Sequence, residues 1–302
     1  DEVLEGILST GESEVDVAGT SRSRAVLAAR CLADEPNVGE DVSRRVLSQL
    51  ASVVMDIDCT RAGNPRSKLD VAVFELAKSS WGDALRAEML RRYMAGERVK
   101  YGGIAASVGY LMNKKDAAAF AAWQDGLLVK MGEDSDEWSC VEGALGASVL
   151  AYHNELREPE RFAAALLSLM GRGERSLFAA SWALCWAVRN YEPDVRGVVE
   201  SHVDVLLGSF SALARLGVHS ERSRLAAWLL GCVGGVLDER IAQVALTFLG
   251  DEVLEVRKAA YAVKGLVAHD SCVSRVVLAL AGESEAVRRA LRSVVLALPL
   301  ER

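Results

Sequence analysis

Proline, aromatic residues and turn motifs are scarce in this sequence. Its 302 residues include 5 prolines, and 6% of them are aromatic. Asn-Gly and Asp-Gly pairs between alternating apolar runs mark hairpins, yet the single such pair, Asp125-Gly126, lies among helix-forming residues. Alanine, leucine, arginine and glutamate, which lose little side-chain freedom in a helix, are abundant. The composition therefore predicts helices and no strand.

Long hydrophobic runs are also missing. The longest uncharged apolar stretch, from Leu225 to Leu237, is interrupted by glycines and is too short to span a bilayer. No cleavable signal peptide is evident, so we expect no membrane association. Because the chain begins at Asp1 without a methionine, we expect it to be a piece of a longer polypeptide.

A basic surplus and paired cysteines are absent as well. The formal net charge is −7, which disfavours nucleic acid as a partner, because nucleic-acid binders usually carry excess positive charge. None of the cysteines forms a Cys-x-x-Cys pair, and most lie in apolar helical runs. We therefore predict buried free thiols and a reducing, cytoplasmic environment. The cysteines are Cys31, Cys59, Cys140, Cys185, Cys232 and Cys272.

Motifs of catalysis are missing too. The chain has no phosphate-binding loop, no Gly-x-Gly-x-x-Gly, no His-Glu-x-x-His and no Gly-x-Ser-x-Gly. The glycine cluster at Gly231–Val236 is better explained by close helix packing. The acidic stretch Gly132–Trp138 is better explained as a helix N-terminus than as a cation site. We expect no catalytic residue, no cofactor, no metal ligand and no enzymatic activity.

A recurring phrase is the strongest positive signal. "DEVLEVRKAAYAVKGLV" at Asp251–Val267 is echoed at Glu283–Leu298, near Arg175 and near Arg222, with weaker copies before residue 140. The copies are spaced by roughly 31 to 47 residues, a period typical of paired-helix repeats. We predict one array over residues 1–302, more divergent in 1–135 and more regular in 136–302. It would contain about eight helix pairs.

Helices between these copies are predicted from apolar residues that recur every three or four positions. Three of them start near Asp41, Trp81 and Asp116, and two more span Pro159–Gly171 and Asp194–Gly208, each closed by its glycine. Two tryptophans and two cysteines occupy matching places in successive copies, which predicts a core between repeats. They are Trp182, Trp228, Cys185 and Cys232.

The phrase at Asp251–Val267 resembles the HEAT-like, armadillo-type repeat, in which an acid, Val-Arg and an alanine-rich pattern mark the second helix. This resemblance implies an all-α fold, a right-handed α-solenoid, and a non-enzymatic scaffold for protein interaction or sensing. Separately, Arg22–Leu50 resembles the helical repeats of bacterial NACHT-type signalling proteins. That resemblance implies the repeat arm of a nucleotide-driven switch.

The partner-binding residues are predicted on the exposed edge of the C-terminal copies. Lys258, Tyr261 and Lys264 lie opposite the apolar face of their helix, and Arg289 and Arg292 repeat this placement. We expect a protein partner there. Two alternatives stay open: a nucleic-acid-binding protein similar to HEAT-like alkylpurine DNA glycosylases, and a HEAT-like lyase or other enzyme. The iron-binding deoxyhypusine hydroxylases are disfavoured because the chain has no His-Glu pair.

Overall fold

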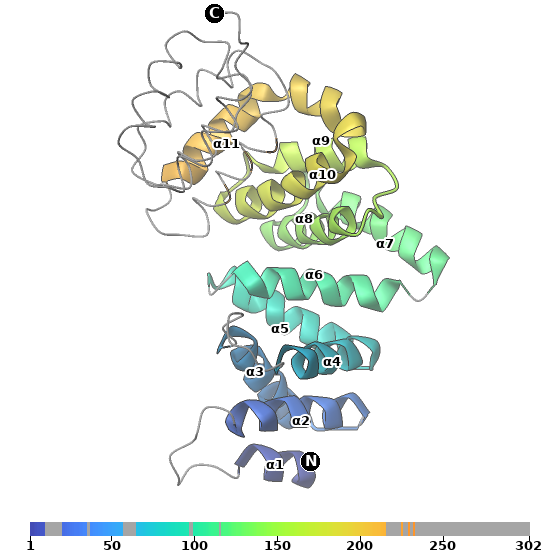
Figure 1. The fold of residues 1–302 in the computed structure, drawn as a ribbon, viewed down its shortest axis with the longest axis vertical. Helices are drawn as coiled ribbons and strands as arrows, with labels where there is room; N and C mark the ends of the chain where they lie inside the picture. Colours follow the sequence, from blue (N-terminus) through green and yellow to red (C-terminus); the bar gives the residue numbers. More distant parts are fainter. Residues whose placement is uncertain are drawn as a thin grey trace, which may run out of the picture. The chain divides into compact units, whose positions relative to one another are not determined.

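A computed structural model describes residues 1–9, 20–34, 37–56, 65–96, 99–114 and 116–215, together with Leu225, Leu229 and Cys232. These residues form eleven α-helices and no strand (Figure 1). The all-α prediction is therefore confirmed for this part of the chain. The clearest sequence repeats, Asp251–Val267 and Glu283–Leu298, lie outside the described residues.

The chain divides into two compact units, Asp1–Trp123 and Gln124–Arg302, which we call unit 1 and unit 2. The prediction of one array over the whole chain stays a prediction. The helices of unit 1 are α1 (Glu2–Ser9), α2 (Thr20–Asp34), α3 (Glu40–Asp56), α4 (Pro65–Lys78), α5 (Gly82–Met94) and α6 (Val99–Asn113). Helix α7 (Ala117–Lys130) crosses the boundary between the units.

In unit 1, helices two positions apart in the chain lie side by side. Helix α2 packs against α4, α4 packs against α6, and α3 packs against α5 (Figure 1). Helix α2 buries small and apolar residues at helical spacing. They are Ala25, Ala28, Ala29 and Leu32. Pro65 begins α4, where its fixed backbone angle suits a first helical position.

Unit 2 repeats this arrangement with α8 (Glu137–Tyr152), α9 (Pro159–Leu169) and α10 (Glu174–Ser201). Helix α8 lies beside α10, and α9 packs on α10 (Figure 1). Both α8 and α10 bury alanines almost completely, and small side chains let two helix axes approach closely. These alanines are Ala144, Ala147, Ala151, Ala179, Ala180, Ala183 and Ala187.

The helix predicted from Asp194 to Gly208 is correct near its start and wrong at its end. Tyr191 has non-helical backbone angles (φ −129°, ψ 28°), so α10 consists of two segments across a kink, and the second contains Pro193 and Asp194 and ends at Ser201. Helix α11 then runs from Val203 to Arg215 straight through Gly208. Leu206 and Phe210, which flank this glycine in α11, are both buried. The free energy gained from burying them outweighs the poor helix propensity of one glycine.

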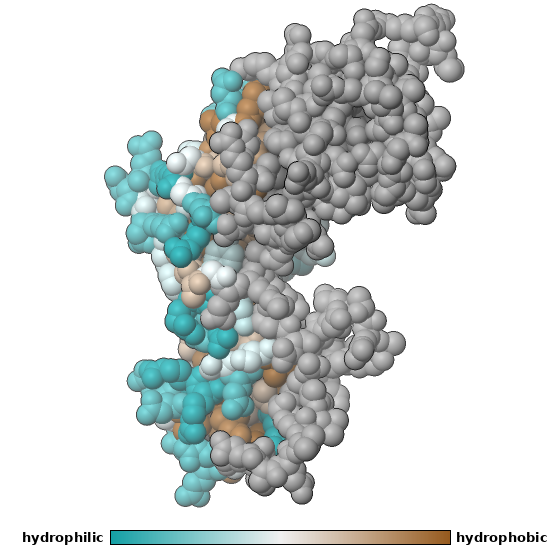
Figure 2. Space-filling view, turned by 90° about the vertical axis from the view of Figure 1, so that its left-hand side faces the viewer, coloured by the Kyte–Doolittle hydropathy of each residue, from teal (hydrophilic) through white to brown (hydrophobic). Residues whose placement is uncertain are grey.

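The described surface carries hydrophilic side chains interspersed with apolar areas, as one face of the molecule shows (Figure 2). Among the described residues, no helix combines the length and the apolar character that a bilayer-spanning segment needs. The large apolar side chains that are most exposed are Val3, Leu27, Val71, Phe74, Val129, Trp138, Tyr152 and Val205.

Gly143 marks a close approach between α8 and the end of α7. A Cβ atom at this position would lie 2.7 Å from Met131 Cγ and 2.9 Å from the carbonyl oxygen of Leu127. The backbone oxygen cannot move aside without shifting its helix. Glycine is therefore required here by space, although alanine is the better helix former.

We expect Gly143→Ala to lower the free energy of unfolding by about 1–3 kcal/mol, because overpacking forces neighbouring atoms to shift. Gly126→Ala, in α7, is the matched control, because a Cβ there meets nothing within 4 Å. That change should raise stability through helix propensity alone. Urea titration of both variants checks the prediction, and equal stabilisation by the two would contradict the close approach.

Candidate functional site

The predicted partner-binding residues, Lys258, Tyr261, Lys264, Arg289 and Arg292, lie outside the described residues. Their role therefore stays a prediction. Two other groups of side chains stand out in the described part. One is a buried polar cluster in unit 1, and the other is an aromatic surface in unit 2.

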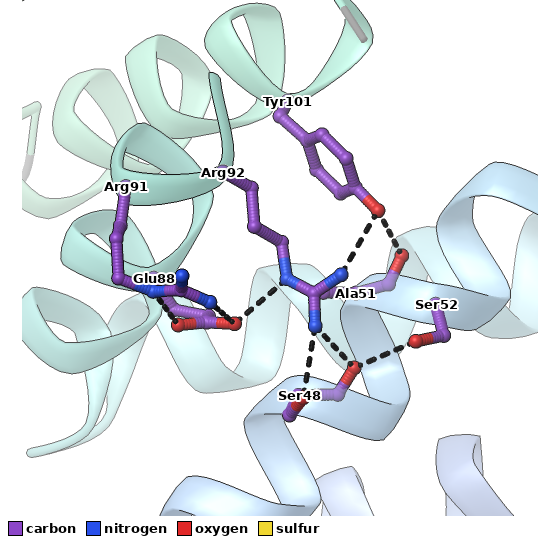
Figure 3. Close-up of polar contacts among 7 residues, drawn as sticks. All are labelled: Ser48, Ala51, Ser52, Glu88, Arg91, Arg92 and Tyr101. Carbon is purple, nitrogen blue, oxygen red and sulfur yellow. Dashed lines mark hydrogen bonds and ion pairs between the residues drawn. The ribbon is translucent and has the colours of Figure 1, made fainter. Parts of the chain in front are cut away.

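The polar cluster is centred on Arg92 of α5, whose side chain is only 12% exposed. Its guanidinium donates to Glu88 Oε1 at 2.7 Å, to Ser48 Oγ at 2.8 Å and to the Tyr101 hydroxyl at 3.4 Å. Tyr101 in turn donates to the carbonyl oxygen of Ala51 at 3.2 Å. One side chain of α5 is thereby tied to both α3 and α6 (Figure 3).

Glu88 accepts hydrogen bonds from two arginines. Arg91 donates to both of its carboxylate oxygens, each at 2.9 Å, and Arg92 donates to Oε1. Burial alone would raise the pKa of Glu88, but these hydrogen bonds and the two positive charges outweigh it and hold the pKa below its usual value. For Arg92, burial alone would lower the pKa, but Glu88 and Tyr101 raise it.

These contacts indicate a structural role. Both charged groups are stabilised in their charged forms, so Glu88 is poorly suited to hold or release a proton near neutral pH. Its two oxygens are already occupied by guanidinium groups. The cluster therefore orients α5 between its neighbours rather than offering a reactive group.

The other Arg-Arg pair in the described part is also engaged by acids. Arg44 pairs with Glu40 and Asp41 one turn earlier, and Arg45 pairs with Glu5 of α1. Exposed ion pairs of this kind contribute little to stability. They do show that these arginines are neutralised locally, as expected for a solvated helix face.

The acidic stretch around Asp136 is a helix N-terminus, as predicted. Asp136 caps α8 by accepting a hydrogen bond from the backbone N–H of Ser139 at 2.8 Å, and this bond lowers the pKa of its carboxyl group. Within the described ranges, no three His, Cys, Asp or Glu side chains come together as metal ligands.

The aromatic surface of unit 2 consists of Tyr152, His153, Trp182, Trp186 and Arg189. The Tyr152 ring meets the Trp186 ring edge to face, with centroids 4.8 Å apart and planes at 85°. It meets His153 in the same way at 5.0 Å, and Trp182 contacts Trp186 at 6.5 Å. The Arg189 guanidinium lies 5.3 Å from the centre of the Trp186 ring.

Two neighbouring helices build this surface. Trp182, Trp186 and Arg189 are spaced by four and three residues, so they share one face of α10. Tyr152 is the last residue of α8, which lies beside α10, and its side chain is 55% exposed. Sequence reasoning placed Trp182 in the core, but it is half-buried; Cys185 is buried as predicted. The spacing along α10 could have revealed part of this surface.

Arg189 differs from the other arginines between residues 157 and 196. Each of the others forms an ion pair with a carboxylate or donates to a backbone carbonyl; they are Arg157, Arg161, Arg172, Arg175 and Arg196. Arg189 is exposed, and in the described part of the chain its guanidinium rests on an indole ring without a carboxylate partner. Among the described residues, no carboxylate occupies its N–H donors, and such donors suit an incoming anionic group.

Neither a protein-family model nor a curated protein sequence matches this chain significantly. The HEAT-like and NACHT-type resemblances remain hypotheses that rest on the residues themselves.

We expect Arg92→Met to lower the free energy of unfolding by about 3 kcal/mol, because it leaves part of a buried charge pair uncompensated. Tyr101→Phe should lower the free energy of unfolding by about 1 kcal/mol, the usual net contribution of one hydrogen bond. Urea titration measures both. The matched control is Arg44→Met, which removes an exposed ion pair and should change little. A similar loss in Arg44→Met would contradict the special role of the cluster.

The polar cluster also predicts how stability depends on pH. The pKa of Glu88 is lower in the folded chain than in the unfolded chain, so its contribution is complete above the unfolded pKa, about 4.3. That contribution is lost as pH falls through the lower folded pKa. In Glu88→Gln we expect a shallower loss of stability below about pH 5 than in the wild type. Parallel slopes in urea titrations across this range would contradict the assignment.

Proposed function

We propose that this protein is a non-enzymatic interaction scaffold, built as an α-solenoid of HEAT-like helix pairs, which binds a partner protein at the aromatic surface. One observation carries the proposal: the exposed Tyr152 ring packs edge to face on Trp186, and the Arg189 guanidinium lies over the same Trp186 ring. The partner is a protein segment that carries an acidic side chain next to an apolar or aromatic one.

The repeat pattern supports the solenoid. In each unit, helices two positions apart in the chain lie side by side, as paired-helix repeats do when each pair stacks on the next. The sequence repeats of roughly 31 to 47 residues have the period that such pairs require. Solenoids of this type commonly present extended surfaces to protein partners.

The residue types of the aromatic surface support protein binding. Trp, Tyr and Arg carry a disproportionate share of the binding energy at protein interfaces, because they bury large area with little loss of side-chain freedom. The rings of Tyr152 and Trp186 hold each other in place before any partner arrives. This preorganisation lowers the entropy lost on binding.

Charge complementarity selects the partner. The Arg189 guanidinium can form a charge-assisted, two-pronged contact with a carboxylate while it stays stacked on Trp186. A carboxylate-bearing segment would then place its apolar neighbour against Tyr152. If the NACHT-type resemblance of Arg22–Leu50 is correct, this binding would be the input to a nucleotide-driven switch.

A random peptide library displayed on phage tests the proposal with the full chain immobilised. We expect the enriched peptides to contain Asp or Glu beside an aromatic or apolar residue. Arg189→Ala and Tyr152→Ala should each weaken binding of the synthesised peptides by about thirtyfold, the range of interface hot spots. Titration calorimetry measures the change.

Two matched controls lie on the same helices. Arg175→Ala removes an exposed arginine of α10 that already pairs with Glu137, and Trp138→Ala removes an exposed ring from the other end of α8. Both should bind peptide as the wild type does. Failure to enrich any peptide, or unchanged binding by Arg189→Ala and Tyr152→Ala, would refute the surface. If the wild type binds single-stranded DNA or RNA tightly and Arg189→Ala does not, the nucleic-acid alternative would replace the protein-binding proposal.

A further inference from the structure

Acidic and aromatic side chains lie together in the acidic stretch Gly132–Trp138, which leads into α8. Glu133 and Asp134 are exposed, and Trp138, in the first turn of α8, is 38% exposed. A segment that carries an acid beside an aromatic residue is the partner proposed above for the aromatic surface. The chain itself therefore contains a segment of the kind that this surface would bind.

Only part of the negative charge of this stretch is used within the chain. Asp136 caps α8 by accepting from a backbone N–H, and Glu137 pairs with Arg175 at 3.3 Å. The carboxylates of Glu133 and Asp134 are exposed, and they form no ion pair with any residue that the structure describes. Two exposed negative charges thus lie close in the chain to an exposed indole ring.

The aromatic surface carries the opposite charge. Arg189 is exposed, and its guanidinium lies 5.3 Å from the centre of the Trp186 ring. Glu192, three residues further along α10, is already paired with Arg196. A positive charge beside the exposed ring of Tyr152 therefore matches two negative charges beside an exposed indole.

These two patches lie at opposite ends of one helix. The acidic stretch leads into the first turn of α8, and Tyr152 is the last residue of α8. A helix of 16 residues is about 24 Å long, which keeps the acidic stretch away from the aromatic surface of the same molecule. The patches can therefore meet only between two molecules.

We propose that the partner at the aromatic surface is a second copy of this chain, which docks its acidic stretch there. Glu133 and Asp134 of one copy face Arg189 of the other, and Trp138 packs against Tyr152. This inference rests on the proposed function, because it names the occupant of the same surface.

The contact is head-to-tail, because the two patches that meet are different. Each copy offers one acidic stretch and one aromatic surface, so a pair of copies joined by one contact still has one of each unused. Contacts of this kind continue into an open chain of copies unless their rotation closes a ring. A symmetric contact between two aromatic surfaces is disfavoured, because it would bring two Arg189 side chains of like charge together.

Sedimentation equilibrium of the full chain over a range of concentrations tests the proposal. We expect the average mass of the wild type to rise above that of a monomer as concentration increases. Arg189→Glu, which reverses the charge of the aromatic surface, should weaken self-association at least about thirtyfold. The double change Glu133→Gln and Asp134→Asn, which neutralises the acidic stretch, should weaken it similarly.

Mixing these two variants distinguishes a head-to-tail contact from a symmetric one. The Arg189→Glu chain keeps its acidic stretch, and the doubly changed chain keeps its aromatic surface. We therefore expect the mixture to form a dimer with one copy of each variant and nothing larger. Absence of this rescue would overturn the proposal.

Glu160→Gln is the matched control, because it neutralises an exposed carboxylate of α9 outside both patches. It should self-associate as the wild type does. Self-association that Arg189→Glu leaves unchanged would overturn the proposal, as would equal weakening by Glu160→Gln.

Peptide binding separates this proposal from the proposed function. The chain with Glu133→Gln and Asp134→Asn keeps its aromatic surface, so it should bind the phage-selected peptides as the wild type does, which also shows that it is folded. A wild type that binds these peptides but stays monomeric would overturn the second copy as the partner and leave the proposed function standing. Loss of peptide binding in Glu133→Gln and Asp134→Asn would overturn the separation of the two patches.

Discussion

Close packing of small residues between helices two positions apart in the chain is the constraint on which the described structure depends. A single helix pair cannot bury its own apolar face, so each helix needs a neighbour from the next pair. Helices α8 and α10 lie side by side and both bury alanines, and Gly143 leaves no room for a side chain against Leu127. Close packing of this kind fixes the rotation of each helix about its own axis.

That fixed rotation decides what the two sides of α10 can do. With Ala183 and Ala187 buried, Cys185 points into the core, while Trp186 and Arg189 reach the surface beside Tyr152 of α8. One helix thereby supplies both core residues and part of the candidate partner surface.

Unit 1 positions its helices with charge as well as with packing. Moving the charges of Glu88 and Arg92 out of water costs free energy that cancels much of their mutual attraction. The pair therefore mainly orients helix α5 and adds little to net stability. Ser48 and Tyr101 accept further hydrogen bonds from the guanidinium, and these bonds tie α5 to both α3 and α6. Arg91 and Arg92 are thus used within the fold.

The sequence by itself determined the helices and several of their ends. Pro65 and Pro159 begin helices and Asp136 caps one, because such signals act within a single turn of backbone. Only the tertiary structure decided that α11 continues through Gly208, that Arg92 reaches Ser48, and which side chains gather around Trp186. These outcomes depend on contacts between residues that are distant in the chain, and such contacts form only when neighbouring helices pack. A local sequence pattern does not contain information about them.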